Sequence, residues 1–197
     1  MTAIFDALTA RIEELERRTG MLERRETSSA WRWDDLQGPA TAGKTSATAP
    51  SFDYTNIGYL FPQNDTTRRL YYVFQLPHAW AEGTTIYPHV HYRQTTSATP
   101  VFRMLYAWYN IGGAVATPTR VYRMDTPVVA YSSGSIHQVL YASGGGIPGA
   151  DKTISIILVC ALYRDDGNTG GDALLYSLDI HYLRDAHGSI SEYGKWA

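Results

Sequence analysis

Short runs of β-branched and aromatic residues follow one another from about Tyr59 to Arg184, and turn-forming Gly, Asn and Asp residues separate them. Such runs favour β-strands, because branched and aromatic side chains pack well on a pleated surface. Strands are expected at residues 70–76, 85–92, 101–110, 119–123, 136–141, 153–163 and 173–184, with a shorter one at 128–131. About eight strands at this spacing predict a mainly β fold, an antiparallel β-sandwich of the jelly-roll type, over residues 58–197.

The expected strand at 153–162 is apolar on both of its faces. We therefore expect a central strand, covered on one side by the other sheet and on the other by a loop or a neighbouring subunit. It contains Cys160, the only cysteine of the chain, so a disulfide within the chain is impossible. A cysteine in such a run commonly packs as a small hydrophobic residue, and we expect a buried, unreactive thiol.

A second period, of three and four residues in turn, runs through residues 5–22. This spacing defines the a and d positions of a coiled coil, and the narrow apolar stripe is typical of a seam between helices. The residues at these positions are Phe5, Leu8, Ile12, Leu15, Thr19 and Leu22. Residues 1–25 are therefore predicted to form a short coiled-coil helix. The alternative is a single amphipathic helix that docks on its own β domain.

Charged residues beside this stripe favour a parallel homotrimer. Arg11 and Arg18 fall at g positions, and Glu16 and Glu23 fall at the following e positions, so that each arginine can pair with a glutamate of the next chain. Residues 11–16 also resemble the short Arg-h-x-x-h-Glu trimerisation motif of parallel coiled coils, where h is an apolar residue. Because three heptads are marginal alone, the β domain is expected to help hold the trimer.

Between these two regions, residues 26–57 differ in composition. Residues 38–50 are small, polar and interrupted by Pro and Gly, which is typical of a linker. We expect an extended arm that lies along its own subunit, a neighbouring subunit or another protein. Trp31 and Trp33 precede this stretch, and they either cover the end of the β core or anchor the arm on a partner.

Two histidines suggest a metal site but lack its usual context. His89 and His91 flank Val90 in an expected strand, so both side chains point to one face. With Gly83 six positions before His89, the segment resembles the opening of the first cupin motif. That motif requires a glutamate about four residues after the second histidine, and residues 93–96 are Arg-Gln-Thr-Thr.

Asp179 and His181 alternate on the last expected strand and could supply the missing ligands of such a site. If they converge with His89 and His91, the four side chains form either a metal site or a buried polar network. We expect histidines that are satisfied by hydrogen bonds, with no metal and no cofactor.

Several function classes are not supported by the sequence. There is no Gly-x-Ser-x-Gly segment, no P-loop and no cysteine–histidine arrangement, so we expect no enzyme. The net charge of −2 gives no basic excess for nucleic acid. The longest apolar run is too short to span a bilayer, and the first residues lack the features of a signal peptide. We expect a protein made and assembled in the cytoplasm of a host.

Several segments together resemble a family of small virion proteins of tailed bacteriophages and prophages. They lie at residues 71–84, 87–92, 107–112, 162–165 and 178–182, and they include Pro-His-Val-His-Tyr and Asp-Ile-His-Tyr. The resemblance implies a structural protein of the phage particle, on the head or at the neck or tail, without a known activity. It also implies that His89, His91 and His181 are framework residues. The heptads are not part of it.

Taken together, these features predict a trimeric capsid decoration (cement) protein of the virion. Its partners would be the major capsid protein or another virion protein, which it would clamp with its extended arms. The alternative is a neck, tail or fibre head domain involved in attachment or host-receptor binding. A cupin-like metal-dependent enzyme that uses His89 and His91 is the third possibility.

Overall fold

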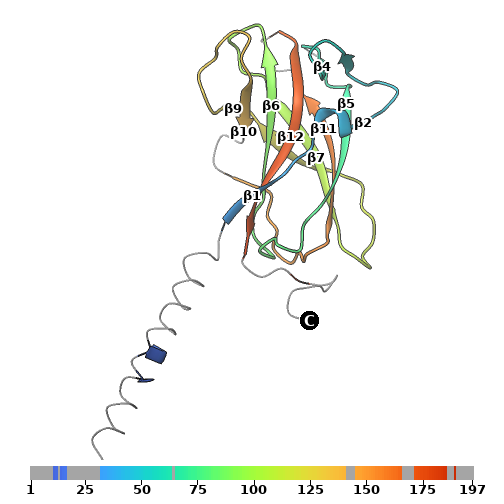
Figure 1. The fold of residues 1–197 in the computed structure, drawn as a ribbon. Helices are drawn as coiled ribbons and strands as arrows, with labels where there is room; N and C mark the ends of the chain where they lie inside the picture. The colour runs from blue at the N-terminus through green and yellow to red at the C-terminus, as the bar shows by residue number, and fades with distance from the viewer. Residues whose placement is uncertain are drawn as a thin grey trace, which may run out of the picture.

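The computed structural model describes residues 11–12, 14–16, 32–63, 65–140, 145–165, 171–185 and 189. Within these residues the protein is mainly β, with two antiparallel sheets and almost no helix (Figure 1). The main helical feature between the strands is the short 3-10 helix η1 (Ala40–Ala42). Over the described residues, no helix has the length and hydropathy needed to cross a membrane.

Of the predicted coiled coil, the described residues are helical at 11–12 and 14–16, where Ile12 and Leu15 are exposed. The rest of the predicted interface lies outside the described residues, namely Phe5, Leu8, Arg18, Thr19, Leu22 and Glu23. Trp31 lies outside them too. The coiled coil and the trimer therefore stay predictions.

The first sheet has seven strands, and the long strand β12 lies near its centre. One edge of β12 pairs with β6, and the other pairs with β4 at its start and with β1 at its end. Its strands are β1 (Arg32–Leu36), β3 (Ser51–Asp53), β4 (Gly58–Phe61), β6 (Tyr87–Gln94), β9 (Thr126–Pro127), β10 (His137–Leu140) and β12 (Ala173–Arg184).

The second sheet has five strands in the order β2-β5-β11-β7-β8. They are β2 (Lys44–Thr45), β5 (Arg69–Gln75), β7 (Phe102–Tyr109), β8 (Arg120–Met124) and β11 (Ile157–Arg164). The apolar segment that was predicted to form a central strand is β11, and its position between β5 and β7 confirms this. It begins only at Ile157, because a turn occupies 154–155 and Ser155 has a φ of 60°.

The inward faces of both sheets contribute to a single hydrophobic cluster. Alternate residues of β5 are buried, as are Val90 of β6 and Ile180 of β12, which follows the two-residue period of a strand. Each large aliphatic or aromatic side chain that is fully buried contributes about 1.5–3 kcal/mol relative to exposure. The strand expected at 128–131 is wrong, because β9 ends at Pro127 and the exposed Val128 and Val129 form a bend.

The extended segment 32–57 lies along its own chain. β1 pairs with β12, β2 pairs with β5, and β3 pairs with β4. Gly38 joins the segment to β12, since its carbonyl accepts a hydrogen bond from the Leu178 N–H at 2.9 Å. A Cβ atom at Gly38 would lie 2.3 Å from the Leu178 carbonyl oxygen, so a side chain there would force the two backbones apart. Of the three expected positions of the arm, the structure shows the one on its own subunit.

Cys160 is buried in β11, and we expect its thiol to be unreactive in the folded protein. Burial raises the pKa of this thiol well above its usual range, so that little thiolate is present at pH 8. A disulfide-exchange reagent should therefore modify the native chain far more slowly than the chain unfolded in guanidinium, where one thiol per chain should react. Equal rates in the two states would show that Cys160 is accessible.

Candidate functional site

A cluster of histidines and carboxylates lies on the face of the seven-stranded sheet that is turned away from the core. Strand β6 contributes His89 and His91, and β12 contributes Asp179 and His181. In the register of the sheet Asp179 lies opposite His89, and Asp35 of β1 lies opposite His181. The four side chains whose convergence the sequence left open do come together, and Asp35 joins them.

Asp179 is the best-connected member of this cluster. Its carboxylate accepts hydrogen bonds from the Gly38 N–H (3.0 Å), the Ser177 hydroxyl (2.8 Å) and Nδ1 of His91 (3.0 Å). Burial by itself would raise the pKa of Asp179, but these hydrogen bonds together outweigh it and lower the pKa below its usual value. Asp179 is therefore an ionised carboxylate that fixes both His91 and the arm at Gly38.

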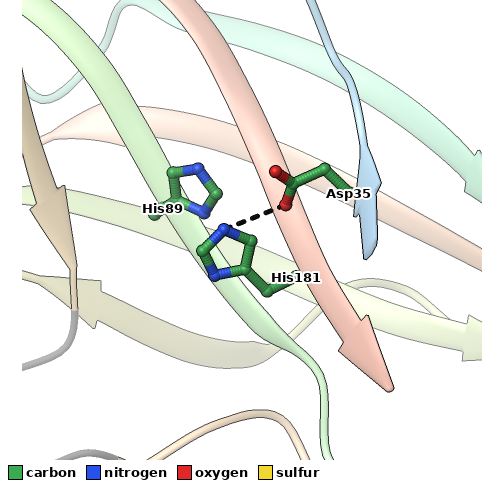
Figure 2. Close-up of side chains that lie close together, drawn as sticks. All are labelled: Asp35, His89 and His181. Carbon is green, nitrogen blue, oxygen red and sulfur yellow. Dashed lines mark ion pairs between the residues drawn. The ribbon is translucent and has the colours of Figure 1, made fainter. Parts of the chain in front are cut away.

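His181 and Asp35 form a second pair at the edge of the cluster. The His181 Nε2 atom lies 3.0 Å from Oδ1 of Asp35, and both side chains are partly exposed. The imidazole of His89 lies against that of His181, with ring centroids 4.2 Å apart. Figure 2 shows Asp35, His89 and His181 pointing toward one another from three neighbouring strands.

His89 differs from the other two histidines because it is buried and poorly paired. It is 2% exposed, its Nδ1 atom has no hydrogen-bond partner, and its Nε2 atom lies 3.9 Å from Oδ2 of Asp179. Burial, followed by the charges of His181 and His91, lowers the pKa of His89 to about 4, against a smaller opposing influence of Asp179. At neutral pH its imidazole is uncharged, and one ring nitrogen carries a lone pair.

A pocket of about 460 Å³ opens beside these histidines, within the size range of small-molecule sites. It is lined by Trp33, Tyr87, Pro88, His89, Tyr122, Leu140, Gly145 and His181. Trp33 contacts Tyr87 edge to face, with ring centroids 5.4 Å apart. The walls are thus largely aromatic, and the imidazoles of His89 and His181 supply polar groups. This arrangement can hold a ring or apolar group beside a hydrogen-bond acceptor or a metal ligand.

Of the two tryptophans singled out in the sequence, the structure places Trp33 in this pocket, where it is 59% exposed. Asp35, Tyr87 and Tyr122 were not identified from the sequence. Asp35 is two residues from Trp33, so a strand at this position would have placed both on one face. The linker-like composition of residues 38–50 favoured an extended arm over a strand at this position, so the shared face was not predicted.

Among the residues that the structure describes, two groups of three side chains could hold a metal ion by geometry. One is Asp35, His89 and His181, and the other is His89, His91 and Asp179. In each group, one donor atom from each residue lies within 4.8 Å of the others. His89 belongs to both groups. Each nitrogen of its ring can bind only one metal ion, so the two groups cannot both use the same nitrogen.

No family model and no curated protein matches the chain. One solved structure that matches is that of the CBM22-1 and GH10 modules of the N-terminal endo-1,4-β-D-xylanase 10B of Clostridium thermocellum, complexed with xylohexaose. The identity is 11%, the TM-score is 0.34, and the match covers 81% of this chain and 27% of that one. The chain thus spans about a quarter of the length of that protein, and so low a TM-score carries no inference about fold or function.

Proposed function

We propose that the protein is an accessory structural protein of a phage virion, a homotrimeric capsid decoration (cement) protein without catalytic activity. The observation that carries this proposal is the heptad pattern of residues 5–22 with its complementary charges, placed before a β domain whose segments resemble small virion proteins. In this proposal residues 1–25 form a three-stranded coiled coil and 58–197 form a jelly-roll β-sandwich. The intervening arm, residues 26–57, contacts the particle through its outer surface, while its described strands stay paired to the sheets of their own chain.

An exposed apolar face of the second sheet supports an assembly of several copies. Val73 of β5 is 70% exposed, and Tyr71 of the same strand is exposed too. Val121 is also exposed, on β8, which β11 and β7 separate from β5. Val73 lies opposite Val159, which in turn lies opposite Ala107. Val121 lies opposite Leu105, two residues from Ala107, so Val73 and Val121 point to the same outer face of the sheet. Large exposed apolar patches mark interaction surfaces. We assign this face to contacts between copies in the trimer, because the short coiled coil needs such help.

Light scattering on the full chain tests the trimer, and the expected mass is that of three chains of 22.0 kDa. Substitution of Leu15 by aspartate should shift the mass toward one chain, because a charge at a d position is desolvated in a coiled coil. Val73→Asp should weaken the trimer as well, while Val128→Asp, at an exposed bend, should leave it intact. A monomeric parent chain would overturn the trimer.

The virion assignment has its own test, in particles produced by cells that encode this chain. Mass spectrometry of purified particles should find the chain in many copies, and Leu15→Asp should reduce its copy number. Its absence from particles would overturn the assignment even if the chain is a trimer.

The pocket favours the second candidate function, a neck, tail or fibre head domain that recognises a host receptor. Trp33, Tyr87 and Tyr122 offer the rigid aromatic surface that recognition sites commonly use. In that case Trp33→Ala particles should assemble normally and adsorb poorly to host cells. Under the decoration proposal, adsorption should not change.

A further inference from the structure

Asp35, His89 and His181 come from three adjacent strands, β1, β6 and β12, and their side chains point toward one another (Figure 2). One donor atom from each lies within 4.8 Å of the other two. Two imidazoles and one carboxylate are a donor set that Zn²⁺ and related divalent transition metals bind in proteins. We propose that these three residues bind such a metal ion, and that its remaining coordination position opens into the pocket. This inference is independent of the virion proposal.

The unpartnered nitrogen of His89 points to a ligand. Its Nδ1 atom is buried without a hydrogen bond, and a buried polar atom in this state is destabilising unless something binds it. The Nε2 atom of the same ring faces Oδ2 of Asp179 at 3.9 Å. Metal-binding histidines commonly turn their second nitrogen toward a carboxylate, which orients the ring. Asp179 is placed for that role, and Nδ1 is the nitrogen left for the metal.

The other two donors already stand at a spacing close to that of metal ligands. His181 Nε2 and Asp35 Oδ1 are 3.0 Å apart. Ligand atoms at bond lengths of about 2.0–2.1 Å in a tetrahedral site lie about 3.3 Å from one another. A metal ion therefore fits between these two groups with a small outward movement, and the donor atom of His89 lies within 4.8 Å of both. Both side chains are partly exposed, which gives the ion a path from solvent.

The alternative group of His89, His91 and Asp179 is a poorer site, because its donors are already engaged. Asp179 accepts three hydrogen bonds, and the Nδ1 atom of His91 is bonded to both Ser177 and Asp179. A metal there would displace most of these bonds, including the one that holds the arm at Gly38.

Three protein ligands leave one position of a tetrahedral ion open, as in metal sites that bind water or a substrate. His89 and His181 both line the pocket, next to the rings of Trp33 and Tyr87. The open position should accordingly take water or an oxygen donor, such as a carboxylate or hydroxyl, of a molecule whose ring or apolar part contacts Trp33.

Calorimetric titration of the full chain with Zn²⁺, after removal of bound metal by a chelator, tests the site. One Zn²⁺ per chain is expected, and His181→Gln and Asp35→Asn should each weaken binding by about 100-fold, since even supporting residues contribute 10- to 100-fold. Asp34→Asn is the matched control. Its carboxylate contacts Tyr182 and Arg184 and accepts a hydrogen bond from the Asp35 N–H. An asparagine oxygen can still accept that bond, so the affinity should not change.

Circular dichroism of each variant separates loss of the site from loss of the fold. If the parent chain does not bind Zn²⁺, or if it binds with an affinity that His181→Gln and Asp35→Asn leave unchanged, the proposal is wrong. If His91→Gln abolishes binding and Asp35→Asn does not, the ion binds at the alternative group of His89, His91 and Asp179. That result would also show that the proposal is wrong.

Discussion

Replacement of Trp80 by alanine is expected to lower the free energy of unfolding by about 3–5 kcal/mol, the usual cost of removing a large core side chain. Trp80 is 0% exposed and stacks on Trp108, with ring centroids 6.3 Å apart. A Cβ atom on Gly149 would lie 2.7 Å from the Trp80 ring, so the surrounding chain is already in close contact with it. Urea unfolding of the full chain, followed by circular dichroism, measures the change.

Trp33→Ala is the control for this experiment, because Trp33 lies at the surface of the pocket and is mostly exposed. Its substitution should change the free energy of unfolding by only about 0.5 kcal/mol. If the two tryptophan substitutions destabilise the chain equally, Trp80 does not occupy a closely packed core.

Arg164→Met is expected to destabilise the protein by about 3 kcal/mol, although methionine replaces the stem of the arginine with another unbranched side chain. Arg164 is 0% exposed at the end of β11. Its Nη1 atom donates hydrogen bonds to the carbonyl oxygens of Phe61 (3.2 Å) and Gly171 (2.7 Å). Methionine cannot donate these bonds, and a buried acceptor that loses its donor costs about 1–3 kcal/mol.

The control is Arg103→Met in the neighbouring strand β7. Arg103 pairs with Asp165 at 2.8 Å, but its side chain is partly exposed, and surface ion pairs contribute only about 0.2–1 kcal/mol. The same urea experiment should therefore show a much smaller effect. If Arg103→Met lowers the free energy of unfolding as much as Arg164→Met does, the loss of a positive charge, and not the burial of Arg164, causes the destabilisation.

The longer strands were predictable because their side chains carry the signal. β5, β7, β11 and β12 are rich in branched and aromatic residues that pack on a core, so composition and period identify them. β2 (Lys44–Thr45) and β3 (Ser51–Asp53) are only two and three residues long and form by backbone pairing at the edges of the sheets. Such strands depend on the neighbour that pairs with them, and a sequence window does not contain that neighbour.

In the histidine cluster, too, part of the arrangement could be predicted from the sequence and part could not. That His89 and His91 share a face follows from the two-residue period, and so does the shared face of Asp179 and His181. That the two pairs meet depends on the register of β6 with β12, which places His89 opposite Asp179. The contribution of Asp35 depends in addition on the pairing of β1 with the far end of β12.

The pairing of β1 with β12 also has a mechanical consequence. Arg32 lies opposite Arg184, so the described chain enters β1 and leaves β12 at the same end of the domain (Figure 1). A pulling force between these two residues acts across the strand pair and opens it one residue pair at a time, as a zipper opens. Such a load would peel Asp35 away from His181 while the second sheet stays closed. Tension between these two ends would thus reach the histidine cluster once three residue pairs, from Arg32–Arg184 to Asp34–Tyr182, have opened.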